Sequence, residues 1–391
     1  MITTLAVHGY RSLRDLVMPL APMTVITGPN GAGKSSLYRA LRLLAATVEG
    51  GVVAPLARDG GLDRVLWAGP ENISGGMRSG HVPIQGASKR SKPVSLMLGF
   101  TTDDLGYLVD IGLPVPGQSI FIHDPVIKRE EIFVPPLFRP AGALVRRKAG
   151  TVTVLGERGG RRVLDDLSPR TSMLAEVADP QEYPELRLMR HTVASWRFYD
   201  SFRTDTDAPA RGSCLGTWTP VLAPDGHDLA AALASIGESA WAEPLNAAID
   251  QAFPDTRVSV APTSDGRFTL EAHQPGMLRP LGPAELSDGT LRFLLLAVAL
   301  LSPAPPSLLV LNEPETSLHP HALPVLAALI AQVAQRTQVI IVSHAPDLIG
   351  PLVQAGGDDR VVHHHLVKNT GETLVEGRGL LTTPTWNWGT R

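Results

Sequence analysis

The sequence predicts an α/β fold built on a parallel sheet, with a lobe of antiparallel strands inserted between its parts. Two apolar β-type runs, residues 308–311 and 339–342, each end in polar residues. The strands of an open parallel sheet end in this way at the edge that carries the chemistry. A glycine-rich loop, residues 28–36, lies between a strand-like and a helix-like run. In the middle of the chain, turn residues break short strand-like runs, which favours antiparallel pairing.

Composition limits the class of protein. The chain has 391 residues, 43% of them apolar and 19% charged, which is typical of a globular protein with one large domain and an insertion, or with two domains. The formal net charge of -3 gives no global basic character that would favour nucleic acid. A single cysteine, Cys214, excludes a disulfide framework and is typical of a reducing cytoplasm.

No stretch of the sequence predicts a membrane partner. The longest apolar run, residues 293–301, is too short to cross a bilayer, and Ser302 and Pro303 end it. The N-terminus lacks the long apolar core of a signal peptide. We therefore expect a cytoplasmic protein.

The first predicted segment, residues 1–60, contains the phosphate-binding motif. Strands are expected at residues 2–8 and 23–27, and leucines at helical spacing predict a helix at 36–48. Between them, GPNGAGKSS satisfies G-x-x-x-x-G-K-[ST], in which glycines let backbone N–H groups close around phosphates. Lys34 should reach the β- and γ-phosphates of ATP, and the Ser35 hydroxyl should bind Mg²⁺. The residues expected to bind the nucleotide here are Gly28, Pro29, Asn30, Gly31, Ala32, Gly33, Lys34, Ser35 and Ser36.

The second predicted segment, residues 61–215, is an inserted β lobe followed by a helical region. After a weakly patterned, glycine-rich start, the pattern predicts strands, then a mostly helical stretch at 171–200 and a loop at 203–213. The expected strands cover residues 94–100, 105–111, 119–123 and 151–155. Residues 128–170 hold ten Lys or Arg against five acidic residues. A solvated surface explains this excess, and a surface for a phosphate backbone is the alternative.

The third predicted segment, residues 216–391, begins with two helices, the first ending at Ser235 after a cap by Asp225 or Asp228. The second helix is expected at 240–252, and a hairpin of two strands follows. The hairpin strands are expected at residues 257–261 and 267–273. Residues 291–301 are apolar on nearly every face, which predicts a helix buried under the sheet.

Four motifs in this third segment follow an order shared with a known group. They are LSDG at 286–289, LLVLNE at 308–313, ETSLHP at 315–320, and a histidine, His344, after the next strand. Together with the glycine-rich loop they resemble the ABC-type ATPases of the SMC, RecF and OLD group, and most closely the stand-alone RecF-like predicted AAA ATPases of bacteria. The resemblance implies a P-loop ATPase head with a mixed central sheet, an antiparallel lobe beside the nucleotide and an inserted middle region.

The resemblance also implies the roles of individual residues. Ser287 and Gly289 match a signature loop that caps the γ-phosphate bound by the opposite protomer; a hydroxyl, a bare N–H and a helix N-terminus all favour an anion. Asp288 stands where many relatives have glycine, which places an extra negative charge near the phosphate. Glu313 matches the catalytic residue that orients and polarises the attacking water. His344 matches the switch histidine at the γ-phosphate, and residues 315–320 match the D-loop at the dimer seam.

Position 312 departs from the pattern of the group, in which aspartate is usual. Asn312 can hydrogen-bond a water on Mg²⁺ but cannot add the negative charge that helps to hold the cation. We therefore expect weaker Mg²⁺ binding and slow turnover.

Other polar residues give weaker signals. Gln85 is the one candidate for a glutamine that senses the γ-phosphate. His319 and His321 have the look of a metal pair, but no third ligand is in register and the D-loop position explains His319 better. The run at residues 363–365 is interpreted as a strand with an exposed face.

The function expected from these motifs is Mg²⁺-dependent ATP hydrolysis coupled to a head-to-tail homodimer with two ATP at its seam. RecF-like resemblance implies DNA binding and repair. The alternative is the sensor or regulatory subunit of an antiphage defence system. Only 47 residues follow His344, too few for the C-terminal nuclease domain of OLD proteins, so an effector or nuclease would be a separately encoded partner. A transporter subunit is disfavoured by the large insertion.

Overall fold

The computed structural model describes residues 1–79, 81–83, 93–117, 119–156, 159–176, 183–200, 202–379 and 382–389. The chain forms two compact units. The first comprises residues 1–21, 27–196 and 364–391, and the second comprises residues 22–26 and 197–363. These divisions differ from the predicted segments 1–60, 61–215 and 216–391. The reason is that the chain after residue 363 packs with the N-terminal strands of the first unit, where β17 (Glu372–Val375) contacts β2 (Leu13–Pro19).

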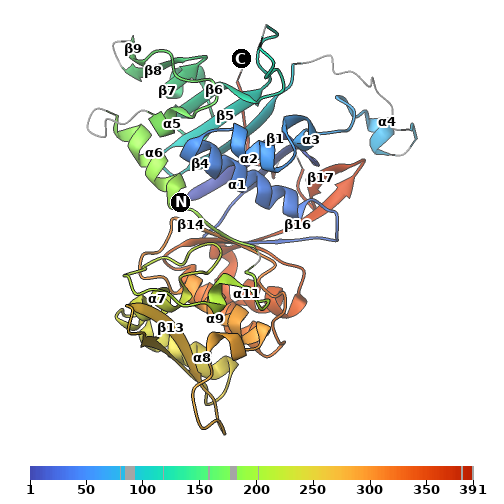
Figure 1. The fold of residues 1–391 in the computed structure, drawn as a ribbon. Coiled ribbons are helices and arrows are strands. Elements are labelled where there is room, and N and C mark those ends of the chain that lie inside the picture. The colour runs from blue at the N-terminus through green and yellow to red at the C-terminus, as the bar shows by residue number, and fades with distance from the viewer. Residues whose placement is uncertain are drawn as a thin grey trace. The chain divides into compact units, whose positions relative to one another are not determined.

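An eight-stranded antiparallel sheet forms the first unit, in the order β2-β1-β4-β5-β6-β7-β8-β9 (Figure 1). Its strands are β1 (Ile2–Tyr10), β2 (Leu13–Pro19), β4 (Leu96–Thr102), β5 (Gly106–Gly112), β6 (Val126–Phe133), β7 (Ala143–Lys148), β8 (Thr151–Gly156) and β9 (Gly159–Leu164). The predicted antiparallel lobe is therefore confirmed. The predicted strand at residues 119–123 is wrong: Ile120 and Phe121 are exposed and pair with no strand, because they belong to the connection between β5 and β6.

Helices pack on one face of this sheet (Figure 1). The predicted helix after the glycine-rich loop is α1 (Lys34–Gly50), whose leucine face is buried against β1, β4, α5 (Met173–Glu176) and α6 (Pro184–Ala194). The glycine-rich stretch after α1 forms three short helices, α2 (Val53–Arg58), α3 (Leu62–Val65) and α4 (Gly75–Arg78). A 3₁₀ turn, η1 (Pro140–Gly142), precedes β7.

A buried ion pair joins the sheet to the segment around α5. Glu130 on β6 and Arg147 on β7 lie 2.8 Å apart with both side chains 0% exposed. The Glu130 carboxylate also accepts hydrogen bonds from Tyr107, Ser172 and the Met173 N–H, and Arg147 donates to the Thr171 and Ser168 carbonyls. Glu130 and Arg147 are thus paired with each other and hydrogen-bonded to their neighbours. These two charges of the stretch 128–170 therefore stabilise the fold and are not available to a ligand.

In the second unit, four strands run parallel in the order β10-β14-β15-β3. They are β10 (Arg197–Tyr199), β14 (Leu308–Asn312), β15 (Gln338–Val342) and β3 (Met23–Thr27). β16 (Val361–Asn369) and β17 (Glu372–Val375), which belong mostly to the first unit, form an antiparallel pair, so the chain combines parallel and antiparallel strands, as predicted. The predicted helix at 171–200 stops early, because residues 197–199 pair with β14 as an edge strand.

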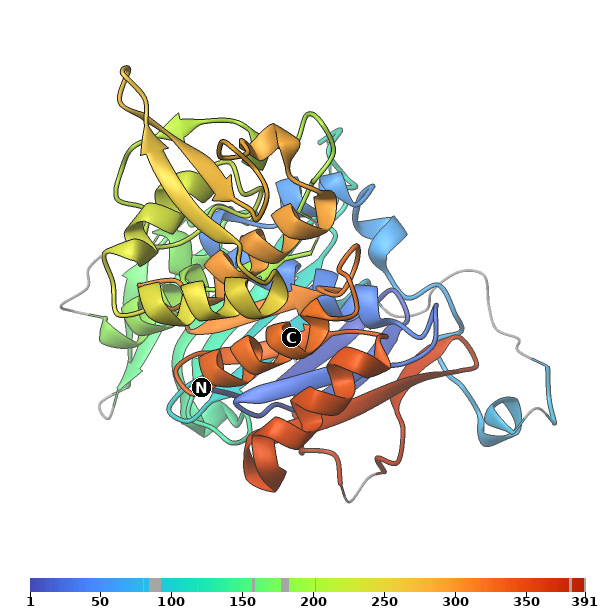
Figure 2. The same cartoon turned by 90° about the horizontal axis from the view of Figure 1, so that it is seen from below.

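The helices of the second unit are α7 (Leu229–Gly237), α8 (Ala242–Ala252), α9 (Asp288–Leu300), α10 (Ala322–Val333) and α11 (Pro346–Arg360) (Figure 2). As predicted, α9 is buried along nearly its whole length, in contact with α7, α8 and α10. Asp228 stands at the N-cap of α7 without a side-chain cap bond; its carboxylate instead accepts from the Ala223 N–H.

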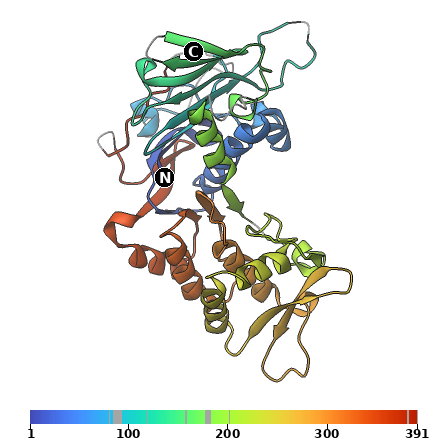
Figure 3. The same ribbon diagram turned by 90° about the vertical axis from the view of Figure 1, so that its left-hand side faces the viewer.

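A smaller antiparallel sheet completes the second unit, in the order β11-β13-β12. It contains the predicted hairpin as β12 (Arg257–Pro262) and β13 (Arg267–His273), the long yellow-orange arrows of Figure 3, with β11 (Cys214–Leu215) at its edge. Two 3₁₀ turns, η2 (Pro209–Arg211) and η3 (Pro283–Glu285), precede β11 and α9. Among the described residues, no helix is long and apolar enough to cross a bilayer.

Candidate nucleotide site

The loop between β3 and α1 has the backbone geometry of an anion cradle. Gly28, Gly31 and Gly33 all have positive φ, at 144°, 79° and 112°. A methyl group at Gly28 would collide with the Leu366 carbonyl oxygen, and one at Gly33 would collide with the Thr373 side chain. Helix α1 starts at Lys34 with no side-chain cap and no acidic residue in its first turn. Its first N–H groups and the positive end of its dipole are therefore available to an anion.

Lys34 lies against the loop that it would serve. Its ammonium donates to the Gly28 carbonyl at 2.6 Å and to the Pro29 carbonyl at 3.2 Å. The residue is 6% exposed, whereas Pro29, Asn30, Gly31 and Ser35 are exposed. The structure thus places one buried cation and a rim of exposed residues, the Ser35 hydroxyl among them, around the same turn.

A part of the chain that the motif does not contain holds this loop. Thr373 of β17 donates its hydroxyl to the Ala32 carbonyl at 2.7 Å and to the Ser12 Oγ at 2.8 Å. Its N–H donates to the Ser12 carbonyl, and its side chain is buried. Where the loop begins, the Thr27 hydroxyl lies 3.0 Å from the His365 Nδ1. Nothing in the sequence marks Ser12, His365 or Thr373 as loop partners, because they are far from the motif along the chain.

In the second unit, polar residues follow two neighbouring parallel strands. Asn312 ends β14 opposite Val342 of β15, and Val342 lies opposite Ile26 of β3. The three strands therefore end at the same edge, and in the chain the glycine-rich loop continues directly from β3. Glu313 follows Asn312 with φ 49°, a left-handed conformation that costs a non-glycine residue roughly 1–2 kcal/mol. Strain of this kind at the end of a strand is typical of functional sites.

The Asn312 side chain presents an unused acceptor. Its Oδ1 is buried and makes no hydrogen bond within the part of the chain that the structure describes. A buried amide oxygen without a partner is costly, and a metal-bound water would satisfy it. No group of three or more His, Cys, Asp or Glu among the described residues could hold a metal. The Asn312 amide oxygen suits a Mg²⁺ ion that keeps most of its waters and binds phosphate oxygens. It does not suit a metal ion that is bound by protein ligands alone.

Glu315 organises the residues after β15. Its Oε1 accepts from the Ser343 hydroxyl at 2.8 Å and from the His344 N–H at 3.0 Å, and it lies 3.3 Å from the His344 Nδ1. The Ser343 N–H donates to the Ile26 carbonyl of β3, which fixes the start of this segment. The Glu315 side chain is 7% exposed and that of His344 is 57% exposed. Because Nδ1 is directed at a buried carboxylate, the Nε2 is the nitrogen left for a ligand.

The signature residues lie at the start of α9. The Ser287 hydroxyl caps the helix by accepting from the Thr290 N–H at 3.1 Å. A side chain at Gly289 would meet the Ser317 carbonyl oxygen at 3.0 Å, so the signature loop packs against the predicted D-loop. Ser287 is exposed.

The expected extra charge at Asp288 is paired. Arg211, whose side chain is 8% exposed, lies 2.8 Å from the Asp288 carboxylate and also donates to the Pro283 and Leu286 carbonyls. The aspartate therefore anchors the loop through Arg211 and presents less free negative charge than the sequence suggested.

One arginine connects the signature helix to the end of β14. Arg292 of α9 donates to the Glu313 carbonyl at 3.4 Å and to the Phe202 carbonyl at 3.1 Å. Burial lowers the pKa of this guanidinium below its ordinary value, while the negative charges of Glu315, Asp200 and Glu313 oppose that shift. Sequence reasoning did not mark Arg292, and it placed Glu315 only in the D-loop, without its contacts to His344.

The remaining predicted residues have different outcomes. Gln85 lies outside the described residues. The His319 and His321 rings stack 5.2 Å apart, and within the described ranges no third ligand joins them. The structure gathers Asn312, Glu313, His344, Ser287 and Gly289 in one unit and the glycine-rich loop in the other. That both sets bind the same ATP stays a prediction.

Comparisons with known proteins agree with this geometry. The family described as "AAA domain, putative AbiEii toxin, Type IV TA system" matches residues 158–350, and one described as "AAA domain" matches residues 4–49. An OLD nuclease of Thermus scotoductus is 46% identical over 48 residues, which are 12% of this chain and 9% of the nuclease.

A solved structure shows the same fold. An Smc head bound to the C-terminal winged-helix domain of ScpA has a TM-score of 0.52 at 14% identity, covering 97% of this chain and 98% of that one. The SMC head domain of Thermotoga maritima gives a TM-score of 0.43 at 16% identity, with 97% and 99% covered. The fold assignment rests on the first of these two structures. It shows that the chain has the fold of an SMC head, and the two AAA-domain matches, at residues 4–49 and 158–350, agree with a P-loop NTPase fold.

Proposed function

We propose that the protein is a Mg²⁺-dependent ATP hydrolase. The observation that supports this most is the loop from Gly28 to Ser36, in which left-handed glycines, an uncapped helix N-terminus and the Lys34 ammonium come together. These are the groups that surround the phosphates in P-loop enzymes. The strained turn at Glu313 is the corresponding feature at the end of β14.

Hydrolysis in such a site depends on positioning and charge, because the protein forms no covalent bond to the phosphate. Glu313 would orient the attacking water. His344, fixed through its Nδ1 by Glu315, would present Nε2 to the γ-phosphate. Mg²⁺, held by the Ser35 hydroxyl and through water by Asn312, would neutralise charge on the β- and γ-phosphates. Lys34 would exchange its contacts to the Gly28 and Pro29 carbonyls for phosphate oxygens.

We further propose that ATP brings two copies together head to tail. Ser287 is exposed at the N-terminus of a 13-residue helix, which supports a role in binding the phosphate of a partner. In this arrangement the Ser287 and Gly289 of each copy complete the site of the other. Two ATP molecules would then lie at the seam.

The role that we propose for this dimer is a RecF-like clamp on DNA, acting in repair. Support comes from the ABC/SMC-related fold and from the cations of residues 128–170. Several of these cations are already used: Arg147 pairs with Glu130, Arg146 with Glu131 and Arg170 with Asp124. A DNA surface would therefore draw on fewer charges than the sequence contains.

A second role is supported by the comparisons. The description of the family that matches residues 158–350 names a putative toxin of a toxin–antitoxin system. The relative from Thermus scotoductus is an OLD nuclease. Under this alternative, the protein is the ATPase sensor or regulatory subunit of an antiphage defence system. In this role the protein would act with a separately encoded effector or nuclease.

The two roles are separated by the ATPase rate measured with duplex, single-stranded and end-bearing DNA at low and moderate salt. A DNA clamp predicts stimulation that decreases with salt, because phosphate contacts release counterions. A basal rate that is indifferent to every DNA would reject the clamp and favour the defence subunit. The absence of any ATPase activity would reject both.

A further inference from the structure

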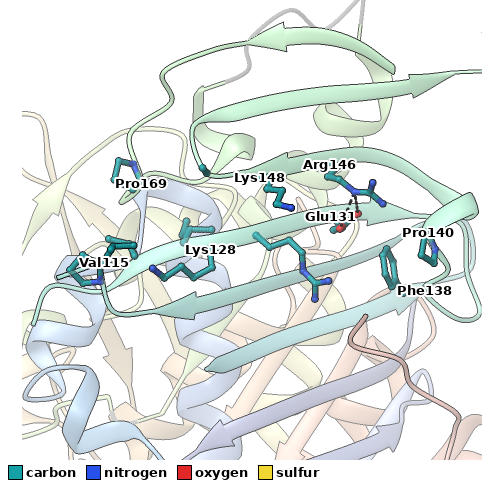
Figure 4. A pocket seen from close by; sticks show the side chains of 13 residues that line it. Val115, Lys128, Glu131, Phe138, Pro140, Arg146, Lys148 and Pro169 are labelled. Carbon is teal, nitrogen blue, oxygen red and sulfur yellow. Dashed lines mark hydrogen bonds and ion pairs between the residues drawn. The ribbon is translucent and has the colours of Figure 1, made fainter. Parts of the chain in front are cut away.

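A cavity of ≈ 690 Å³ lies on the face of the eight-stranded sheet opposite the buried Glu130–Arg147 pair. Because side chains alternate along a strand, Arg129 and Glu131 of β6 point away from Glu130, and Arg146 and Lys148 of β7 point away from Arg147. These four residues line the cavity. Figure 4 shows Lys148, Arg146 and Glu131 between Phe138 and Pro140 at one end and Val115 and Pro169 at the other.

The cavity carries an excess of positive charge. Its lining contains four cations, Lys128, Arg129, Arg146 and Lys148, and one carboxylate, Glu131. The register places Arg129 directly opposite Lys148, and Glu131 directly opposite Arg146. The Glu131 carboxylate forms an ion pair with Arg146, and both of its oxygens lie 3.2 Å from the Arg146 Nε. On its other side Arg129 lies opposite Asp110 of β5, so a carboxylate is beside it, and Lys148 is the exposed cation of the cavity.

A short segment of the chain fixes two of the lining residues. Arg129 donates a hydrogen bond to the Trp388 carbonyl and lies over the ring of Phe138. The Asn387 side-chain amide donates to the Phe138 carbonyl at 3.2 Å. Trp386 packs edge-on against Phe133, 6.1 Å between ring centroids. Residues 387 and 388 therefore hold two residues of the cavity wall, Arg129 and Phe138, in place.

We propose that this cavity binds a phosphorylated small molecule of nucleotide size. Its volume lies in the range of small-ligand sites, and its mixture of apolar walls and a few converging cations is typical of them. Arginine forks and a lysine ammonium suit a phosphate. The Phe138 ring and the proline side chains of the lining offer apolar surfaces for the ring of a base. A duplex is disfavoured, because Arg129 is 6% exposed and Glu131 is 2% exposed, too recessed for a DNA backbone. The proposal does not depend on the ATPase assignment.

The test is calorimetric titration of the full chain with each of the four ribonucleoside 5′-monophosphates. A Lys34→Ala background removes the lysine of the glycine-rich loop, and the intact chain is titrated beside it. We expect at least one monophosphate to bind both proteins alike, and inorganic phosphate to bind at least about tenfold more weakly for lack of a ring.

Lys148→Glu should weaken the binding by at least about tenfold, because an exposed cation at the cavity is reversed. Arg187→Glu is the matched control, since it reverses an exposed cation on α6 and should leave the affinity unchanged. The proposal is overturned if no monophosphate binds, if Lys148→Glu binds as the parent does, or if Lys34→Ala abolishes the binding. A single-stranded oligonucleotide that binds where no monophosphate does would also overturn it and assign the surface to nucleic acid.

Discussion

Glu315 is the residue that the structure adds to the candidate site. One buried carboxylate oxygen accepts from Ser343 and from the His344 backbone and lies beside the His344 ring. The carboxylate lies 3.3 Å from the ring Nδ1 and so favours one orientation of the ring. Glu315 is thus a positioning residue, acting through His344 and not on the phosphate itself.

Glu315→Gln should lower kcat by about 10- to 100-fold with little change in KM for ATP, because a misplaced catalytic group reduces the rate more than binding. Steady-state kinetics of Glu315→Gln, His344→Ala and the double variant measure this. The double variant should be no slower than His344→Ala alone. If the two effects multiply, Glu315 acts independently of His344.

A second prediction for a single residue concerns Asn312 and Mg²⁺. Asn312→Asp adds a negative charge where Oδ1 is buried without a partner, and it should lower the Mg²⁺ concentration for half-maximal ATPase activity by about tenfold. Mg²⁺ titration of the rate measures the change, with Asn312→Ala expected to move in the opposite direction. An unchanged Mg²⁺ dependence and rate in Asn312→Asp would contradict a role near the metal.

The shape of the glycine-rich loop depends on a contact with strand β17. The Thr373 hydroxyl of β17 bonds the Ala32 carbonyl and Ser12, and it is buried. Replacing it leaves two polar partners without a hydrogen bond. This contact is one of several that join the end of the chain to its beginning.

Thr373→Val should therefore destabilise the protein by about 1–3 kcal/mol, and KM for ATP should rise because the cradle is less ordered. Chemical denaturation and ATP titration measure both effects. Thr153→Val on β8 is the matched control, since it makes the same exchange in a strand away from the loop. Equal ATP affinity in Thr373→Val and the control would show that β17 does not order the loop.

The sequence predicted elements well where local pattern decides them. The glycine-rich loop, α1, α9, β14, β15 and the β12–β13 hairpin follow from spacing, apolar periodicity and turn residues. The prediction from the sequence failed where pairing with a distant strand determines the secondary structure. Residues 197–199 form a strand because they pair with β14. Residues 119–123 form a loop because no strand pairs with them. For the same reason Thr373, Glu315 and Arg211 could not be predicted, because their roles come from contacts far along the chain.

At the scale of the whole molecule, the account depends on two copies sharing their sites. Ser287 and Gly289 gain a function only if they meet the phosphate of a partner. Ser287 is exposed at the N-terminus of α9, as such a contact requires. The size of the particle in solution therefore tests it directly.

Glu313→Gln should hold ATP without hydrolysing it and so preserve the dimer. Light scattering on this variant with saturating ATP and Mg²⁺ should give about twice the 41.7 kDa of one chain. Adding Ser287→Arg to the same variant should restore the single mass, because a bulky cation obstructs the signature loop. A Glu313→Gln protein that stays at the mass of one chain with ATP and Mg²⁺ would contradict the ATP-driven dimer.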